Sequence, residues 1–208
     1  MGGESRTASR DRQRPSIRAR QKEQTRRLLA DAALALFADK GYAATTIDDI
    51  TSAVGASRAT FYLHYDGKIR IVAEAYESVI MPETAAYYHR LDAIHGATEL
   101  RAWLDDALGF FERHRLLLRV AEEAVSAEPG FDQLAPARLL DRCAECMPRH
   151  LDRWEGADRE SARLRIELLI LQLSSFARLW VEGHWPVSRE LALDVLHDLW
   201  SHALRDVR

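Results

Sequence analysis

The chain has 208 residues, enough to bury the core of one or two domains, and its 47% hydrophobic and 29% charged residues are typical of a soluble globular protein. The longest apolar stretch, at 168–173, is far too short to span a membrane, and no apolar run follows the basic N-terminus as in a signal peptide. Two cysteines exclude a disulfide framework, so we expect a cytoplasmic protein.

The net charge of −3 is unevenly distributed along the chain. Residues 1–27 hold nine basic and three acidic residues, a net charge of +6 that leaves −9 for the remainder. A basic segment on an acidic body favours a polyanionic partner at one end of the molecule. We expect residues 1–21 to form a flexible basic arm, which either reaches into a DNA minor groove or is a solvated tail.

Three helices are predicted after this arm. In 25–42 apolar residues recur at the step of an amphipathic helix, and Gly41 is expected to end that helix in the left-handed conformation. Thr46 with Asp49 comes close to a capping box for the second helix, and Ser57 is suited to cap the third. Two short helices joined by the three-residue turn GAS form the helix-turn-helix pattern.

The third predicted helix, SRATFYLHY at 57–65, concentrates ring side chains beside a cation. At four-residue spacing, Phe61 and Tyr65 share one ridge, which we assign to the core of the domain. The other ridges, one of which holds Arg58 and Tyr62, remain free to face a polar partner.

These segments resemble the DNA-binding domain of the TetR/AcrR family of bacterial transcriptional regulators. The resemblance is carried by ALALFADKGY, TTIDDITSAVGAS, TFYLHY and the lysine that opens the following helix. It implies an all-α protein of about nine helices, with a three-helix DNA-binding domain at 22–68 and the helix-turn-helix motif at about 46–65. The remaining segment, 69–208, is then a helical ligand-binding and dimerisation domain.

In a helix-turn-helix, the second helix enters the major groove with its N-terminal residues toward the base edges. Arg58 suits either a bidentate contact to guanine or a plain phosphate contact, and the small side chain of Ala59 allows close approach to the groove. By resemblance, Tyr62, His64 and Lys68 contact phosphates, Lys68 together with the N–H groups at the start of its helix. The expected DNA-binding residues are Thr46, Ser57, Arg58, Ala59, Thr60, Tyr62, His64 and Lys68.

From about residue 70 the pattern indicates further amphipathic helices, without strand patterns or repeats. Pro82 and Pro148 are expected to kink or bend the helices that contain them, and a turn is expected at 128–130. The last two helices have apolar faces wide enough for two partners. The resemblance implies that they form a four-helix bundle in a homodimer, which a two-fold operator also requires; the alternative is that they only cover their own core.

The resemblance also implies an apolar effector cavity between the DNA-binding domain and the last two helices. Trp103 and Phe110 share one helix face, and Phe176 and Trp180 share another, so both pairs are suited to line it. Ordinary core packing is the alternative for each of them. Aromatic lining favours a hydrophobic or aromatic effector. The candidate effector-binding residues are Trp103, Phe110, Met147, Gln172, Phe176 and Trp180.

Cys143, Cys146 and His150 lie at positions i, i+3 and i+7, on one face of a continuous helix. This spacing makes a metal- or thiol-redox-sensing regulator the alternative to an effector-binding one. A C-x-x-C pair without a second cluster is an incomplete metal site, and a buried cysteine is ordinary core packing, so we expect no bound metal.

The chain contains no G-x-S-x-G, Walker loop, H-E-x-x-H or dinucleotide glycine fingerprint. We therefore expect no enzymatic activity and no cofactor. The predicted function is a transcriptional repressor that binds a palindromic operator as a homodimer and is released by a small hydrophobic or aromatic effector. A sequence-blind architectural DNA binder is the remaining alternative, and it would bind with a large salt dependence but no preferred site.

Overall fold

The computed structural model describes residues 16–134 and 136–205. Over this part of the chain the structure is helical and contains no strand, which confirms the predicted all-α fold. The helical elements in chain order are α1 (Ile17–Lys40), α2 (Ile47–Val54), α3 (Arg58–Tyr62), α4 (Lys68–Ala75), the π-helical η1 (Tyr76–Ile80), α5 (Met81–Asp92), α6 (Ala97–Ala127), the 3-10 segment η2 (Asp132–Leu134), α7 (Pro136–Glu145), α8 (Pro148–Leu151), α9 (Gly156–Val181) and α10 (Arg189–Arg205). No helix among these combines the length with the apolar character that crossing a bilayer requires.

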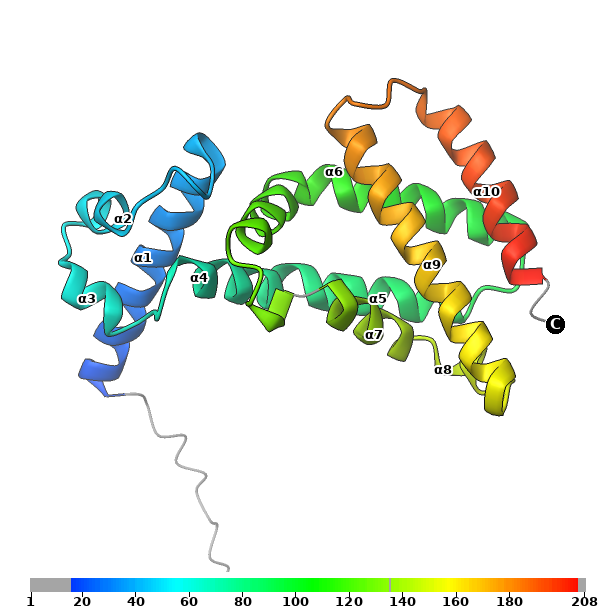
Figure 1. Cartoon of the computed structure of the whole chain (residues 1–208), viewed down its shortest axis with the longest axis horizontal. Helices are drawn as coiled ribbons and strands as arrows, with labels where there is room; N and C mark the ends of the chain where they lie inside the picture. Colours follow the sequence, from blue (N-terminus) through cyan, green and yellow to red (C-terminus); the bar gives the residue numbers. More distant parts are fainter. Residues whose placement is uncertain (1–15, 135, 206–208) are drawn as a thin grey trace, which may run out of the picture.

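The molecule is elongated, with α1, α2 and α3 forming a small domain at one end (Figure 1). α4, η1 and α5 run in line from this domain into the rest of the molecule, and α6 runs beside them. α9 and α10 lie against α6 at the opposite end, where the described chain ends. The single long helix α6 therefore spans the distance from the small domain to the far end.

Short-range capping explains where the first three helices begin. The Ser16 hydroxyl accepts the Ala19 N–H at 3.2 Å, and the Ser57 hydroxyl accepts the Thr60 N–H at 3.1 Å. At α2 the Thr46 hydroxyl accepts the Asp49 N–H while the Asp49 carboxylate accepts the Thr46 N–H, which completes the predicted capping box.

The two glycines that end α1 and α2 differ. Gly55 adopts the left-handed helical conformation, with φ 66° and ψ 29°. Gly41 has a positive φ of 86° but an extended ψ of 158°, so the left-handed cap that we predicted there is wrong. The reason is the chain direction: after Gly41 the backbone extends toward α6, where a Cβ on Gly41 would lie 3.3 Å from Glu123 Oε2.

The core of the small domain comes from all three of its helices and from α4. Phe61 and Tyr65 are buried, as the spacing in the third helix predicted, and their ring centroids are 5.9 Å apart. They share one cluster with Leu29, Phe37 and other residues of α1, and the cluster continues into Val120, Ala121 and Ala124 of α6. The small domain and the C-terminal part of α6 are therefore packed as one body.

The two prolines that were expected to kink or bend helices have different effects. Pro82 lies in the first turn of α5, directly after the π-helical η1, so the predicted break falls within an unbroken run of helical turns. Pro148 begins the separate short helix α8, because α7 already ends at Glu145. The bent helix that we predicted there is wrong, and two helices take its place.

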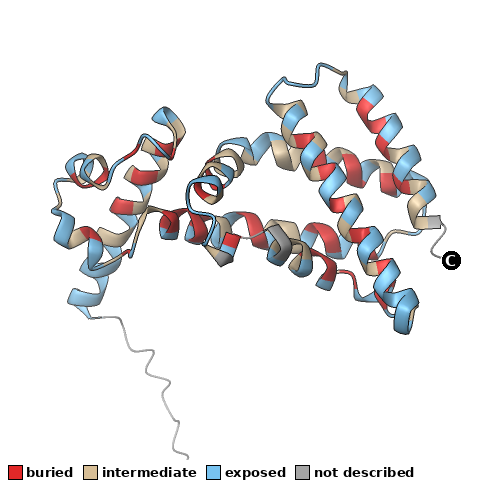
Figure 2. Ribbon diagram, viewed as in Figure 1, coloured by how far each residue is buried: buried red, intermediate tan, exposed pale blue. Residues whose placement is uncertain are grey.

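The second core fills the far end of the molecule and is built around Trp103. Its ring stacks on Tyr87 at 4.1 Å between centroids and lies 5.0 Å from the ring of Trp200. The Trp103 indole N–H also donates to the Tyr87 carbonyl at 2.9 Å, which satisfies its polar atom. Along α9 and α10 buried and exposed residues alternate (Figure 2), so each helix packs with one side on this core and leaves another uncovered.

Candidate DNA-binding surface and ligand cavity

The exposed face of α3 carries the residues that we predicted to meet DNA. Phe61 points into the core, and Arg58, Ala59 and Tyr62 lie on the exposed side, with Tyr62 50% exposed. Ser57 is exposed as well, although its hydroxyl is engaged as the helix cap. This arrangement leaves the N-terminal end and the outer side of α3 accessible to a groove.

Arg58 is held beside α2 by an ion pair. Its Nη1 donates to Asp48 Oδ2 at 2.9 Å, and both side chains are more than half exposed. Exposed pairs of this kind contribute little to stability, roughly 0–1 kcal/mol. Arg58 can therefore exchange Asp48 for a base or a phosphate at small cost.

Thr46 and Asp49 form a polar cluster at the start of α2. The Thr46 hydroxyl donates to Asp49 Oδ2 at 2.6 Å, and the Lys40 ammonium lies 2.7 Å from the same oxygen. The hydrogen bond from Lys40, followed by those from Thr46, lowers the pKa of the Asp49 carboxyl. The Thr46 hydroxyl proton and Lys40 are both engaged by Asp49, so a phosphate contact at Thr46 would require them to exchange partners.

Lys68 lies differently from the outward-facing lysine that we expected. Its ammonium donates to the carbonyls of Tyr42 at 2.9 Å and of Thr45 at 2.6 Å, and it sits 4.3 Å from the centre of the Tyr42 ring. Burial lowers the pKa of Lys68. Because an ammonium has three N–H groups, one remains for a phosphate at most.

His64 is half-buried, and its Nδ1 has no hydrogen-bond partner among the described residues. Burial lowers the pKa of His64, and the positive charges of Lys22 and Arg26 lower it further. The ring is therefore neutral at pH 7 and can donate from one nitrogen only.

The predicted basic arm is largely outside the described residues, which begin at residue 16. Residues 17–21, which we assigned to the arm, form the first turns of α1 instead. Arg18, Arg20 and Lys22 are exposed there, so part of the basic charge lies on a helix that belongs to the small domain.

A cavity of about 510 Å³ lies in the body of the molecule, enclosed by η1, α5, α6, α7 and α9. Its walls are mostly apolar and aromatic. They are formed by Tyr76, Ile80, Thr84, Tyr87, Tyr88, Ala107, Phe110, Phe111, Leu118, Ala121, Glu122, Val125, Ser126, Leu134, Leu139, Leu140, Cys143, Ile170, Leu171, Leu173, Ser174, Ser175 and Arg178. We call this space the aromatic cavity.

Of the six candidate effector residues, Phe110 lines the aromatic cavity. Trp103 is buried between other rings of the second core, and Met147 lines a different cavity at the far end. Neither residue lines the aromatic cavity, and Trp103 instead stacks on Tyr87, whose side chain does line it.

The remaining three candidates hold α9 and α10 in place. Gln172 accepts a hydrogen bond from the Trp200 indole at 3.1 Å, and Trp180 donates to the Val187 carbonyl at 2.9 Å. The Phe176 ring packs edge-on against Trp185 at 5.6 Å. Phe176 and Trp180 both pack against the second core, as their shared helix face predicted, and none of the three residues lines the aromatic cavity.

The tyrosines of the aromatic cavity are the residues that sequence reasoning missed. Tyr76, Tyr87 and Tyr88 come from η1 and α5, and the cavity also exposes Thr84 of α5. The sequence holds these tyrosines within one segment, 76–88, but helical spacing alone does not show whether a ring lines a cavity or fills a core.

The predicted cysteine–histidine face does not form. Cys143 is buried on α7 and Cys146 follows the end of that helix, whereas His150 lies on α8 and lines the other cavity. Burial raises the pKa of Cys143 to about 12 and also raises that of Cys146, so both stay protonated thiols at pH 7. In the described part of the chain, no three metal-ligating side chains come together.

Comparison with known proteins places the small domain among bacterial regulators. The model of "Bacterial regulatory proteins, tetR family" matches residues 29–75. The biofilm operon icaADBC HTH-type negative transcriptional regulator IcaR of Staphylococcus epidermidis is 42% identical over 50 residues, which is 24% of this chain and 27% of that protein. IcaR of Staphylococcus aureus is 31% identical over 74 residues, 32% of this chain and 40% of that protein. The chain thus matches less than half the length of these relatives.

Solved structures share the fold of nearly the whole chain. The TetR-family transcriptional regulator PfmR from Thermus thermophilus has a TM-score of 0.56 at 24% identity, covering 86% of this chain and 97% of its own. A TetR-family transcriptional regulator from Streptomyces coelicolor has a TM-score of 0.58 at 20% identity, covering 89% and 88%. The comparisons therefore support a helix-turn-helix domain of the kind found in bacterial regulatory proteins, attached to a helical body. Residues 29–75 thus match the TetR family, and the rest of the chain shares the fold of its solved members.

Proposed function

We propose that this regulator is a repressor that binds a palindromic operator as a homodimer and is released when a small hydrophobic or aromatic effector enters the aromatic cavity. The observation that carries the proposal is the position of α6, which lines the cavity with one side and contacts the small domain with the other. The name of the IcaR relatives, negative transcriptional regulators, supports repression as the mode of action.

For DNA binding we assign residues 22–68 to the domain that enters the groove. Arg58 and Ala59 approach the base edges, Ser57 and Thr60 lie beside them, and Tyr62 contacts the backbone. The flanking phosphate contacts come from Thr46 and His64, and from the N–H groups at the start of α4 beside Lys68. The exposure of this side of α3 and the weak Arg58–Asp48 pair support the assignment.

For dimerisation we propose a four-helix bundle of α9 and α10 with their copies. Both helices leave an apolar stripe exposed at helical spacing. The stripe consists of Leu164, Leu168, Leu171 and Leu179 on α9 and of Leu191, Val195 and Leu199 on α10. A contiguous apolar surface of this length on a water-soluble protein favours an interface over solvent exposure, and two-fold symmetry fits a palindromic site.

The effector is proposed from the chemistry of the aromatic cavity. Its volume suits a drug-sized molecule, and the five rings on its walls favour an apolar or aromatic body. At one end Glu122 and Arg178 form an ion pair with each other, which leaves hydroxyl groups such as that of Ser174 to orient a polar substituent.

The coupling between cavity and DNA is proposed to run through the C-terminal third of α6. Arg119 donates to the Ala38 carbonyl at the end of α1 at 3.2 Å, and Glu123 accepts the Tyr42 N–H at 2.8 Å. On the same helix, Leu118 directly precedes Arg119, and Ala121 lies between Arg119 and Glu123. Leu118 and Ala121 both line the aromatic cavity. A ligand that displaces this part of α6 therefore displaces the attachment of the small domain.

The mechanism is a shift between two populations of the dimer, one with its α3 helices spaced for successive major grooves and one without. An effector can release DNA only to the extent that it prefers the second state. To change the ratio of the second state to the first from 1:99 to 99:1, the effector must bind the second state roughly 10⁴-fold more tightly, a difference of about 5.5 kcal/mol.

The test uses a labelled operator fragment, a panel of apolar aromatic compounds and fluorescence anisotropy, with binding of each compound followed separately by tryptophan fluorescence. We expect at least one compound to bind and to release the operator from the wild-type protein. In Glu123→Ala the compound should still bind but release should weaken, while Glu145→Ala, an exposed position on α7, should behave as wild type. Release that is equally complete in Glu123→Ala, or a panel without any releasing compound, would contradict the proposal.

A further inference from the structure

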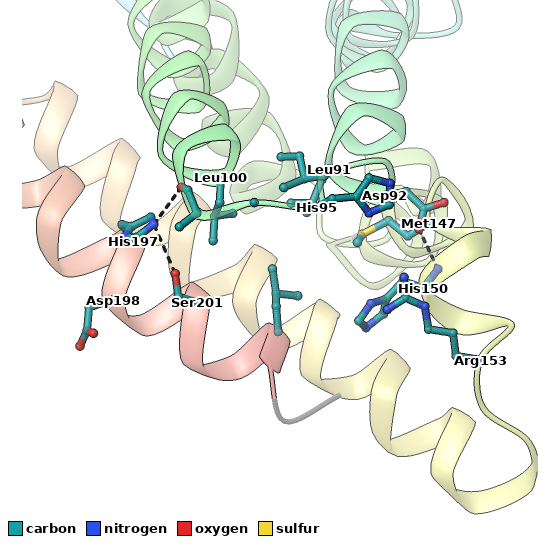
Figure 3. Close-up of a pocket in the computed structure, with 14 residues that line it drawn as sticks. Leu91, Asp92, His95, Leu100, Met147, His150, Arg153, His197, Asp198 and Ser201 are labelled. Atoms are coloured by element: carbon teal, nitrogen blue, oxygen red, sulfur yellow. Dashed lines mark hydrogen bonds between the residues drawn. The ribbon is translucent and has the colours of Figure 1, made fainter. Parts of the chain in front are cut away.

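A second cavity, of about 570 Å³, lies at the end of the molecule opposite the small domain. It is formed where the α5–α6 connection, α8 and the C-terminal half of α10 meet (Figure 3). We call it the distal cavity. It shares no lining residue with the aromatic cavity, so the effector proposed above does not account for it.

His150 is a buried polar group that faces this cavity. It is 7% exposed, its Nε2 has no hydrogen-bond partner among the described residues, and its ring points from α8 toward α10 in Figure 3. A buried nitrogen without a partner costs free energy, and such atoms are rare in native proteins. The ring is therefore placed where a bound molecule can complete its hydrogen bonding.

The position of His150 is fixed by the backbone around it. Asp92, at the end of α5, accepts the His150 N–H at 2.8 Å with one carboxylate oxygen and the Arg149 N–H at 2.9 Å with the other. Asp92 is itself buried, so this contact holds the first turn of α8 rigidly against α5. The imidazole is thus presented to the cavity by a preformed structure.

The charges around the distal cavity favour an anion. Arg153 lies at its edge, exposed, and forms no ion pair with any described residue. Of the two acidic side chains on the walls, Asp92 is held by the N–H groups of α8, and Asp198 lies on α10, across the cavity from Arg153 (Figure 3). The Arg153 guanidinium is therefore available to an anion on the α8 side of the cavity.

The floor of the distal cavity is apolar. Leu91, Leu100 and Met147 are buried there, and Ile94 and Leu204 complete the surface. His197 closes one side, where its Nε2 donates to the Ala97 carbonyl at 3.0 Å (Figure 3). A molecule that enters this space meets apolar side chains on the floor and polar side chains around them.

We propose that the distal cavity binds a small carboxylic acid with an apolar body, whose carboxylate pairs with Arg153 and hydrogen-bonds to His150 Nε2. A guanidinium presents parallel N–H groups to a carboxylate, which makes this pairing strong and directional. Burial lowers the pKa of His150, so the ring is neutral and donates a single N–H without competing for the negative charge. The regulator then has two ligand sites of different chemistry on one chain.

The experiment titrates the full-length protein with benzoate, hexanoate and cyclohexanecarboxylate, and with benzamide as the uncharged counterpart of benzoate, by isothermal titration calorimetry up to about 10 mM. The test variant is Arg153→Gln. Arg149→Gln removes the same charge four residues away, outside the cavity lining, and Arg178→Gln removes the guanidinium that lines the aromatic cavity.

We expect at least one carboxylate to bind with one site per chain, and about tenfold or more weaker binding in Arg153→Gln. Arg149→Gln and Arg178→Gln should bind as wild type. The proposal is overturned if no carboxylate binds, if benzamide binds as tightly as benzoate, or if Arg178→Gln and not Arg153→Gln loses binding, because the acid then occupies the aromatic cavity.

A second variant separates binding from folding. His150→Leu removes the unpartnered nitrogen and keeps an apolar side chain of similar size, so thermal unfolding of the ligand-free protein should occur at the same or a higher temperature, while carboxylate binding weakens. A variant that is less stable and binds as tightly as wild type would show that His150 serves packing alone, and would overturn its assignment to the site.

Discussion

Glu123 on α6 accepts the backbone N–H of Tyr42 at 2.8 Å, so a carboxylate of the helical body holds the chain directly after the end of α1. The Tyr42 hydroxyl donates to Glu128 at the end of the same helix. These two contacts and the Arg119 hydrogen bond to Ala38 fix the small domain on α6. In the proposed mechanism, the orientation of α3 toward DNA depends on this attachment.

Gly41 is required for that attachment. Its φ of 86° lies in the region that disfavours side chains, and an added Cβ would press on Glu123 Oε2. We expect Gly41→Ala to lower the free energy of unfolding by about 1–2 kcal/mol and to weaken operator binding. Gly67→Ala is the control, because Gly67 has an ordinary extended φ and no neighbour in reach. Equal denaturant midpoints for the two variants would count against the proposed strain.

Lys68 is expected to stabilise the fold as well as to assist DNA binding. In Lys68→Met the carbonyls of Tyr42 and Thr45 lose the hydrogen bonds from the ammonium, and we expect a cost of about 1–3 kcal/mol in urea unfolding. Lys40→Met removes the more exposed pair with Asp49 and should cost less than about 1 kcal/mol. If Lys68→Met has the same free energy of unfolding as wild type and only its affinity for DNA falls, the ammonium contributes to phosphate binding and not to the stability of the fold.

Arg58 distinguishes base recognition from simple charge attraction. Arg58→Ala should cost about 1–3 kcal/mol of discrimination at one operator position if the guanidinium reads a base, and should instead reduce the salt dependence by about one phosphate contact if it binds the backbone. Arg90→Ala is the matched control and should change neither quantity, because Arg90 forms a similarly exposed ion pair with Asp106 away from α3. Operator titrations at several salt concentrations measure both effects. If neither the base discrimination nor the salt dependence changes, Arg58 does not contact DNA.

Placing a charged residue in the apolar stripe on α9 and α10 tests whether the stripe forms the dimer interface. Leu168→Glu or Val195→Glu should convert the dimer to monomers, because the carboxylate would be buried at the centre of the proposed bundle. Leu116→Glu places the same charge on an exposed leucine of α6 and should leave the dimer intact. Light scattering after gel filtration gives the masses; a stable Leu168→Glu dimer would place the interface elsewhere.

We expect that the two cysteines do not act as redox sensors. The pKa of Cys143 is raised to about 12, so its reactive thiolate is a negligible fraction at pH 7 and increases only as the pH rises toward that value. Mild peroxide should therefore leave operator binding unchanged in the wild type and in Cys146→Ser alike. Loss of binding on oxidation in the wild type, absent from the serine variant, would restore the thiol-switch alternative.

Local chemistry explains which parts of the structure the sequence predicts. The caps at Thr46 and Ser57 and the burial of Phe61 and Tyr65 depend on residues three or four positions apart, so they can be read from the chain alone. The conformation of Gly41 depends on Glu123, which is 82 positions away, and no pattern within the first helix contains that contact.

The cavities could not be predicted for the same reason. Whether Trp103 or Tyr87 faces open space depends on how α5 packs beside α6, and in the structure the two rings stack on each other. The separation of His150 from the two cysteines depends on the end of α7 before Pro148. Helical spacing identified apolar faces correctly but could not tell a core from a cavity wall.

Selection of bound fragments from genomic DNA by the purified protein tests the central claim most directly. The account predicts enrichment of an inverted repeat with half-sites about one helical turn, or a multiple of it, apart. The enrichment should be lost in Tyr62→Ala and kept in Trp185→Ala, an equally exposed ring in the connection between α9 and α10, away from α3 (Figure 1). Tight binding without a preferred sequence, or enrichment that survives Tyr62→Ala unchanged, would contradict operator recognition by this face of α3.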